Sequence, residues 1–219
     1  HALVRRQRQM CIRDRCCLPK FDSPSIFAKI IDNSIGGFFK VETEGSYNVS
    51  QEYFKNTCIL KTSFNNGYDE FYIIDYMPRY QNKKKSYYSP PEITRIIKHI
   101  KGNPKIRILY DPKLDYSIGK TKSYVKDNFI VSISENENYE TLYLYSNANL
   151  NAIINNDVIE LESDLFFKIS YYEKLIYPKF KEILLEFNHT KEYWTNWIKK
   201  TPNFKKYNNE ILRSALTLK

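Results

Sequence analysis

Hydrophobic positions in this chain fall mostly in short runs rich in β-branched and aromatic residues, and turn residues separate the runs. The pattern extends from Val41 to Leu175, at the spacing of about 8–12 residues that is typical of antiparallel sandwiches. The clearest case is a hairpin at Asn65-Asn66-Gly67, between the runs Cys58–Phe64 and Glu70–Tyr76. Further strands are expected at Lys105–Tyr110, Tyr124–Ile133 and Glu140–Tyr145, and Val158–Leu161 is expected to pair with Phe166–Tyr171. The sequence therefore predicts a mainly β protein built as an antiparallel β-sandwich.

The segment after Pro90-Pro91 is compatible with a helix and with a strand. Its isoleucines have helical spacing, which slightly favours a helix with Glu92 in its first turn. One face of a strand is equally well formed, by Thr94, Ile96, Lys98 and Ile100. Periodicity alone leaves both alternatives open for residues 92–100.

A short helix is predicted within the stretch Cys16–Val41. Ser23 can cap its N-terminus, and Pro24 fits the first helical position. Apolar side chains then fall on one helical face, at Ile26, Phe27, Ile30 and Ile31. The helix is expected to close at Asp32-Asn33, after which two glycines turn the chain into an extended segment from Phe38.

Two further helices are predicted after Pro178. The first has a broad apolar stripe, formed by Ile183, Leu184, Phe187, Trp194, Trp197 and Ile198. Thr201-Pro202 ends it, and Asn208 or Asn209 can cap a second helix over Glu210–Lys219. Because both tryptophans lie on the apolar stripe, they are expected to pack in the core rather than stack on a ligand.

The composition indicates a folded protein, since 42% of the 219 residues are hydrophobic and 16% are aromatic. No apolar run approaches the ~18 residues of a membrane span, and no secretory signal is visible. The four cysteines include no C-x-x-C pair, and the three histidines are scattered. We therefore expect a cytoplasmic protein with buried reduced thiols, no metal site, no cofactor and no membrane partner.

The net charge of +9 is unevenly distributed. Residues 1–15 contain five arginines and one acid and contribute +4 of it, whereas the rest of the chain has four arginines and is otherwise basic through lysine. This change in usage predicts that residues 1–15 are a non-native tail. The arginine-poor remainder also argues against a nucleic-acid partner, which the net charge alone suggests.

Several short motifs occur along the chain in a recognisable order. They are Leu18–Asp32 with Gly36–Phe39, Gln51–Tyr53, Ile74–Arg79, Arg95–Ile97, Asp111–Tyr116, Trp194-x-x-Trp197 and Arg213–Leu216. Residues 16–219 thereby resemble the N-terminal part of bacterial and archaeal glycoside hydrolase family 15 proteins, which include glucoamylase-like, glucodextranase-like and trehalase-like enzymes. The resemblance implies a strand at residues 92–100. It also implies a sandwich domain at 16–177, a helical linker at 178–207 and the first helix of an (α/α)6 barrel at 208–219.

Glycosidic hydrolysis requires two carboxyl groups that flank the bond. None of the 25 acidic residues stands in a constellation that singles it out. The resemblance implies that both catalytic glutamates lie in the barrel, beyond Lys219, so no catalytic residue is assigned in this chain and the fragment alone is expected to be inactive. The implied reaction is inverting hydrolysis of an α-glucan, a maltooligosaccharide or trehalose.

One candidate substrate-binding residue is Asp22, which lies just outside the predicted helix on a turn that can project toward a following domain. Asp75, Asp115 and Tyr116 are instead interpreted as structural, with the acids bonding turn amides. Two other classes stay open. The first is a stand-alone, non-catalytic carbohydrate-binding sandwich, and the second is a basic, aromatic-rich nucleic-acid binder.

Overall fold

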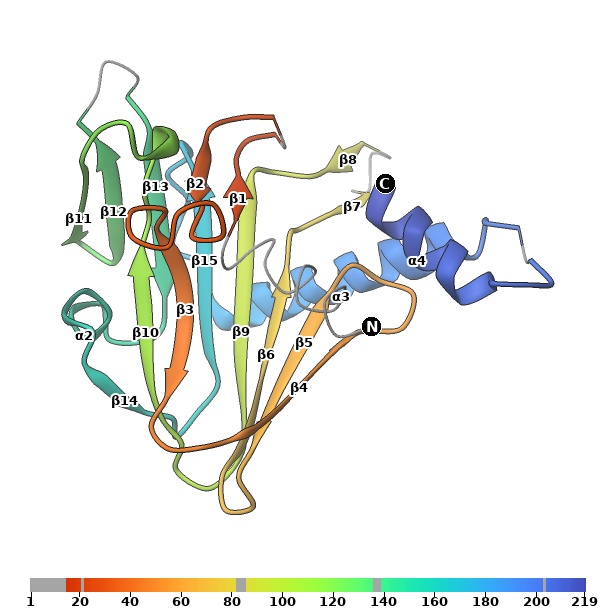
Figure 1. Ribbon diagram of the computed structural model, residues 1–219, viewed down its shortest axis with the longest axis horizontal. Coiled ribbons are helices and arrows are strands. Elements are labelled where there is room, and N and C mark those ends of the chain that lie inside the picture. Colours follow the sequence, from red (N-terminus) through yellow and green to blue (C-terminus); the bar gives the residue numbers. More distant parts are fainter. Residues whose placement is uncertain (1–14, 21, 82–85, 136–138, 203) are drawn as a thin grey trace.

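A large antiparallel sheet forms the body of the molecule, and a small sheet packs on one of its faces (Figure 1). The computed structural model describes residues 15–20, 22–81, 86–135, 139–202 and 204–219. The large sheet has the strand order β11-β12-β13-β15-β9-β6-β5-β4, and the small sheet has the order β14-β10-β3. The predicted mainly β, antiparallel fold is therefore confirmed.

The strands of the large sheet are β4 (Asn48–Tyr53), β5 (Leu60–Asn65), β6 (Glu70–Tyr76), β9 (Glu92–Lys101), β11 (Thr121–Lys126), β12 (Phe129–Ser134), β13 (Thr141–Ser146) and β15 (Leu165–Tyr171). Those of the small sheet are β3 (Phe38–Thr43), β10 (Lys105–Asp111) and β14 (Val158–Glu160). Two ribbons pair β1 (Cys16–Cys17) with β2 (Ser25–Phe27) and β7 (Tyr80–Gln81) with β8 (Tyr87–Tyr88). The helical segments are η1 (Asp115–Ser117), α2 (Leu150–Asn155), α3 (Phe180–Ile198) and α4 (Asn208–Leu218).

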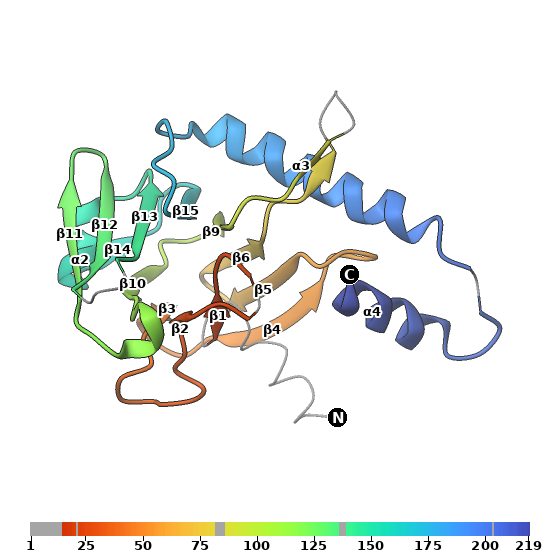
Figure 2. The same ribbon diagram turned by 90° about the horizontal axis from the view of Figure 1, so that it is seen from above.

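The two faces of the large sheet bury separate cores, because alternate side chains point to opposite faces. The inner face packs against the small sheet through a cluster that includes Phe71, Ile97 and Phe167 together with Phe39 and Ile108. The outer face is covered by α3, as Figure 2 shows from above. Its cluster is formed in part by Ile59, Ile74, Ile96, Phe166, Ile183 and Trp194.

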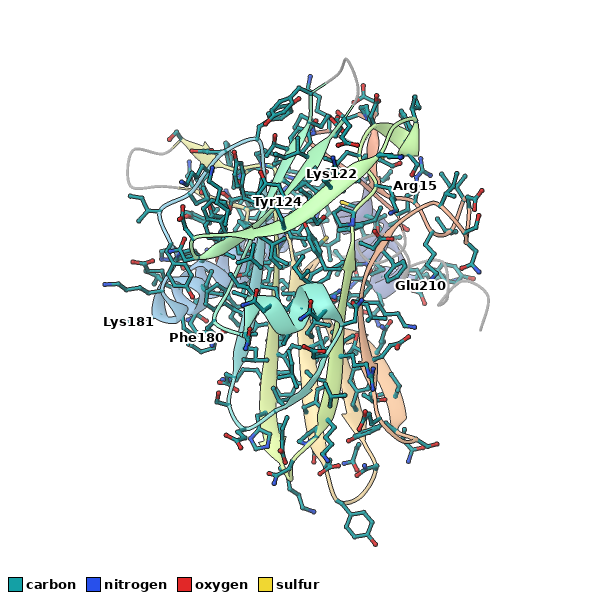
Figure 3. The ribbon with its side chains drawn as sticks, turned by 90° about the vertical axis from the view of Figure 1, so that its left-hand side faces the viewer. Arg15, Lys122, Tyr124, Phe180, Lys181 and Glu210 are labelled. Atoms are coloured by element: carbon teal, nitrogen blue, oxygen red, sulfur yellow. The ribbon has the colours of Figure 1, made fainter. Side chains whose placement is uncertain are left out.

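Edge strand β11 presents its exposed face to solvent, and Figure 3 shows Lys122 and Tyr124 along it. Lys122 forms an ion pair with Glu135. A charged lysine on an edge strand discourages pairing with another chain. No helix in the part of the chain that the structure describes is long and apolar enough to cross a membrane.

Several local predictions are confirmed. The hairpin joins β5 to β6 with Gly67 at φ +91°, a value that glycine adopts readily. Residues 92–101 form a strand, β9, which lies between β15 and β6 near the middle of the large sheet. Helices α3 and α4 occupy the two segments predicted after Pro178, but neither Asn208 nor Asn209 caps α4, which begins at Asn208 and has Tyr207 at its N-cap position.

The predicted helix after Ser23 is wrong. Residues Ser25–Phe27 form strand β2, and the next residues make turns that Asp32 stabilises by accepting bonds from Ser34 and Ile35. Ile26 and Phe27 are fully buried, whereas Ile31 is 67% exposed, so these side chains do not share one helical face. Tertiary burial therefore overrides the apparent helical spacing.

Three other details differ from the predictions. β14 does not pair with β15, because β14 joins β10 in the small sheet while β15 lies between β13 and β9. The run Tyr124–Ile133 is divided into β11 and β12 by a turn with Asp127 at φ 52°. Helix α2 was not predicted, although Asn149 caps it by accepting bonds from the amides of Asn151 and Ala152.

Candidate functional site

Asp22 lies on the turn between β1 and β2, at the top of Figure 1. The turn is closed by two bonds between Lys20 and Ser23: the Ser23 amide donates to the Lys20 carbonyl at 3.1 Å, and the Lys20 amide donates to Ser23 Oγ at 3.2 Å. Ser23 therefore stabilises a tight turn rather than a helix N-terminus. The Asp22 side chain is exposed, and within the described residues its carboxylate forms no hydrogen bond or ion pair.

A left-handed turn at η1 packs beside the Asp22 turn. The Tyr116 hydroxyl donates to the Ser23 carbonyl at 3.3 Å, and Ser117 Oγ donates to the Ile35 carbonyl at 2.8 Å. The structure thus brings together two motifs that are about 90 residues apart in the sequence, the one at Asp22-Ser23 and the one ending at Tyr116.

The backbone of η1 is strained. Asp115, Tyr116 and Ser117 have φ values of 48°, 54° and 61° in succession, and each left-handed non-glycine residue costs roughly 1–2 kcal/mol. Such strain persists only where the surrounding structure imposes it, and it is concentrated at functional sites. We therefore regard Asp22, Ser23 and η1 together as a candidate site, which we call the rim.

Glu140 fastens the rim to the large sheet. Its side chain is buried, with Oε2 accepting from the Asp115 amide at 2.8 Å and Oε1 accepting from the Tyr171 hydroxyl at 2.7 Å. Burial and the adjacent Glu140 carboxylate raise the pKa of Tyr171, so its hydroxyl stays protonated and donates. The contacts differ from the predicted ones, because Asp115 is held through its backbone amide, whereas bonds from its carboxylate to turn amides were predicted, and Tyr116 acts through its hydroxyl.

Asp75 is structural, but its partner differs from the predicted turn amides. It forms a two-point ion pair with Arg95, with Nε to Oδ1 at 2.7 Å and Nη2 to Oδ2 at 3.2 Å. Arg95 Nη1 also donates to the Phe39 carbonyl at 3.0 Å, and its guanidinium lies 4.2 Å from the Phe39 ring centroid. The pair therefore fastens the large sheet to β3 of the small sheet.

A second buried charged group lies on the outer face, beneath α3. Lys168 Nζ lies 2.7 Å from Glu92 Oε2 and 2.6 Å from Glu186 Oε2, so one ammonium serves two carboxylates. Tyr76 and Thr94 donate to Glu186 Oε1 at 3.2 and 3.1 Å. Burial raises the pKa of Glu92 above its ordinary value. We call these five residues the helix seat.

Helix α4 is attached to residues that flank β5 and β6 of the large sheet, and the two arginines involved belong to the sequence motifs described above. Arg213 Nη1 donates to the Thr57 carbonyl at 2.8 Å, and Arg79 Nη1 donates to the Lys219 carbonyl at 3.0 Å. Cys58 Sγ donates to the Leu216 carbonyl at 3.1 Å, and burial raises the pKa of this thiol. Cys17 and Cys58 are free thiols, Cys16 is buried, and Cys11 lies outside the described residues.

A pocket of about 280 Å³ opens between the β7–β8 ribbon and α3. Its rings come from Tyr80, Tyr87, Tyr193 and Trp197, and its polar side chains come from Gln81, His189, Glu192, Asn196 and Lys200. The prediction that both tryptophans pack in the core is confirmed for Trp194, which is buried, whereas Trp197 also lines the pocket. The pocket was not predicted, although His189, Tyr193 and Asn196 share one face of α3 at helical spacing, and Lys200 follows the end of this helix.

The fold and these motifs define a class of protein, an antiparallel β-sandwich followed by a helix that packs on the sandwich. A family model described as "Trehalase-like, N-terminal" matches residues 2–147. The chain belongs to this family of trehalase-like N-terminal domains.

Curated relatives extend the match over most of the chain. The trehalase of Thermoplasma acidophilum is 30% identical over 210 residues, which are 93% of this chain and 35% of that protein. The trehalase of Thermoplasma volcanium is 27% identical over 211 residues, which are 93% of this chain and 33% of that protein. The chain therefore spans about a third of the length of these relatives. No solved structure matches it.

Proposed function

We propose that this chain is the N-terminal part of a trehalase-type glycoside hydrolase of family 15, whose preferred substrate is trehalose. The similarity to the Thermoplasma acidophilum trehalase, at 30% identity over 93% of the chain, carries this proposal. Maltooligosaccharides and the non-reducing ends of α-glucans are the substrates of the glucoamylase-like alternative.

We place the catalytic pair of carboxylates beyond Lys219, in the barrel that the family resemblance implies. An inverting glycosidase needs a protonated acid and an ionised base about 6.5–9.5 Å apart, with room for water between them. Four acids of this chain are instead engaged in structural roles: Asp75 with Arg95, Glu140 at the rim, and Glu92 with Glu186 in the helix seat. This engagement supports a scaffold role for the chain and leaves the chemistry to the remainder of the protein.

The rim supplies one substrate contact in this proposal. Asp22 carries an exposed carboxylate that has no partner among the described residues, and a carboxylate can accept hydrogen bonds from sugar hydroxyls. The strained turn at η1 and the bond from Tyr116 to Ser23 hold the Asp22 backbone in place. A fixed turn with a free acceptor at its tip suits the edge of a pocket built mainly by another domain.

The reaction is tested with the intact protein, the full-length product of the gene, by comparing kcat/KM for trehalose, maltose and maltotriose. We expect trehalose to be preferred and proton NMR of the fresh products to show equal amounts of α- and β-glucose, since inversion occurs at one of two α-linked centres. The 219-residue chain alone should release no glucose. Preference for maltotriose favours the glucoamylase-like alternative, and sugar binding without turnover by the intact protein favours the carbohydrate-binding module.

The role of Asp22 is tested by comparing Asp22→Ala with Ser23→Ala in the intact enzyme. Loss of a substrate contact should lower kcat/KM about tenfold, or about 1.4 kcal/mol, at unchanged unfolding free energy. Ser23→Ala should instead cost about 0.5–1.5 kcal/mol of stability, because it removes the bond to the Lys20 amide, with little kinetic effect. Unchanged kinetics for Asp22→Ala would show that Asp22 is part of the scaffold.

A further inference from the structure

The pocket between the β7–β8 ribbon and α3 has two walls from distant parts of the sequence. Tyr80 and Tyr87 come from the ribbon, and Tyr193 and Trp197 come from the C-terminal half of α3. The Tyr87 and Tyr193 rings meet at 90°, with centroids 6.1 Å apart. The pocket therefore presents aromatic surfaces in more than one orientation.

Neighbouring side chains hold the aromatic walls in place. Tyr80 lies between Tyr88 and His189, with ring centroids 4.8 and 5.2 Å away. Tyr193 packs edge-on against the buried Trp194 at 5.2 Å, and the Arg79 guanidinium lies 5.5 Å from the Tyr193 ring. Rings with fixed positions bind a ligand at a smaller entropic cost than mobile rings.

Polar groups between the rings can form hydrogen bonds in both directions. Asn196 can donate and accept, Glu192 accepts, and Lys200 donates. Among the described lining residues, the charge of one acid, Glu192, is balanced by that of one lysine, Lys200. The lining therefore favours a neutral ligand with many hydroxyl groups over a strongly charged one.

We propose that this pocket binds a neutral saccharide of one or two pyranose rings. A pyranose has apolar C–H faces that pack on aromatic rings, and hydroxyl groups around its edge that pair with amides and carboxylates. A volume of about 280 Å³ lies just below the usual range for small-molecule pockets, about 300–1,000 Å³, which suits a small ligand. The inference goes beyond the proposed hydrolysis, because it requires binding without turnover by the residues of this chain.

Fluorescence of the 219-residue chain provides a direct test. The chain has two tryptophans, of which Trp194 is 6% exposed and Trp197 lines the pocket, so a bound sugar should change mainly the Trp197 emission. Trehalose, maltose and glucose are titrated, with glycerol as a hydroxyl-bearing compound that lacks a pyranose face. We expect saturable changes with the glucosides, none with glycerol, and loss of the signal in Trp197→Phe.

Tyr87→Ala is the deciding variant, with Tyr68→Ala as its matched control. Both tyrosines are exposed, at 70% and 84%, but Tyr68 lies in the β5–β6 turn, so neither change should unfold the protein. Tyr87→Ala should weaken binding about tenfold, while Tyr68→Ala leaves it unchanged. Equal affinity of the two variants, no saturable signal with any glucoside, or tighter binding of glucose 6-phosphate than of glucose would overturn the proposal. None of these results depends on hydrolysis by the intact protein.

Discussion

The two faces of the large sheet bury charge in different ways. On the inner face, Arg95 and Asp75 form a balanced pair with two direct contacts. On the outer face, Lys168 is shared by Glu92 and Glu186, so the helix seat holds more negative than positive charge. Hydroxyl groups from Tyr76 and Thr94 satisfy the remaining oxygen of Glu186.

This difference indicates that the two faces respond differently to their surroundings. The inner pair needs no further donors for its carboxylate and joins two sheets, so it should act as a permanent fastening. The outer group places an acid with a raised pKa beneath α3, so the attachment of this helix should depend on pH. Since α3 forms one wall of the aromatic pocket, we expect the outer group to help position that wall.

The largest effect is expected from Arg95→Met. The change leaves the Asp75 carboxylate buried without its partner, which costs about 3–5 kcal/mol. Urea unfolding measures the loss. Arg107→Met is the matched control, because Arg107 pairs with Glu44 at the surface and should contribute about 0.2–1 kcal/mol. Similar losses for the two variants would show that the inner pair is not a fastening.

Lys168→Met should have the next largest effect, about 2–4 kcal/mol at neutral pH, because two carboxylates lose their shared counter-ion. The loss should be smaller than for Arg95→Met, since Glu92 can take up a proton. Detachment of α3 should shift the emission of the buried Trp194 to longer wavelength before the sheets unfold. Lys122→Met, on edge strand β11, controls for loss of a surface charge.

The sequence was sufficient to predict those strands and helices whose hydrophobic pattern is local. The alternation in β5 and β6 and the stripe on α3 predicted strands and a helix because each face buries its own side chains. The inner ion pair was hidden because Asp75 and Arg95 meet only through the register of β6 on β9. The rim was hidden in the same way, since Ser23 and Tyr116 are 93 residues apart in the sequence and meet only in the tertiary structure.

The same limit explains the false helix and the missed pocket. Ile26 and Phe27 have helical spacing with later isoleucines, but the surrounding core buries only the earlier pair. Of the pocket residues, those on α3 share a face that can be read from the sequence, whereas Tyr80 and Tyr87 join them only through tertiary packing. Asp22 was selected from its motif, and its role as a substrate ligand stays a prediction.

The pH dependence of the unfolding free energy provides a further test of the difference between the two faces of the sheet. The folded pKa of Glu92 is raised, so the native state binds a proton more readily than the unfolded state does. Its contribution to stability is therefore complete below the unfolded value of about 4.3 and is lost as the pH rises through the folded value. Glu92→Gln should remove this dependence and leave the other carboxylates to titrate.

We expect the stability of the wild type relative to Glu92→Gln to fall as the pH is raised from about 4 to 7. Urea unfolding at several pH values measures this difference. The effect should be smaller than that of Lys168→Met, since glutamine keeps the shape of the side chain and introduces no unpaired charge. A constant difference over the whole range would contradict a titrating group in the helix seat. Glu44→Gln, at the surface, is the matched control.

The smallest expected change in stability comes from removing a single buried hydroxyl group on either face of the large sheet. On the outer face, the single hydroxyl proton of Tyr76 is shared between the Ile183 carbonyl, at 3.1 Å, and Glu186 Oε1, at 3.2 Å. On the inner face, the Tyr110 hydroxyl accepts from Ser132 Oγ at 3.3 Å. Tyr76→Phe should cost about 1.5 kcal/mol and Tyr110→Phe about 0.5 kcal/mol, because the bond to a carboxylate is the stronger one.

Both substitutions remove one oxygen from a buried ring and keep its packing, so thermal and urea unfolding compare the hydrogen bonds directly. Tyr76→Phe should also change the Trp197 emission, because the lost bonds connect the sheet to α3. Tyr110→Phe should leave that emission unchanged. If the two variants lose equal stability and neither alters Trp197, then α3 is held by its apolar contacts alone, and the helix seat does not position the pocket.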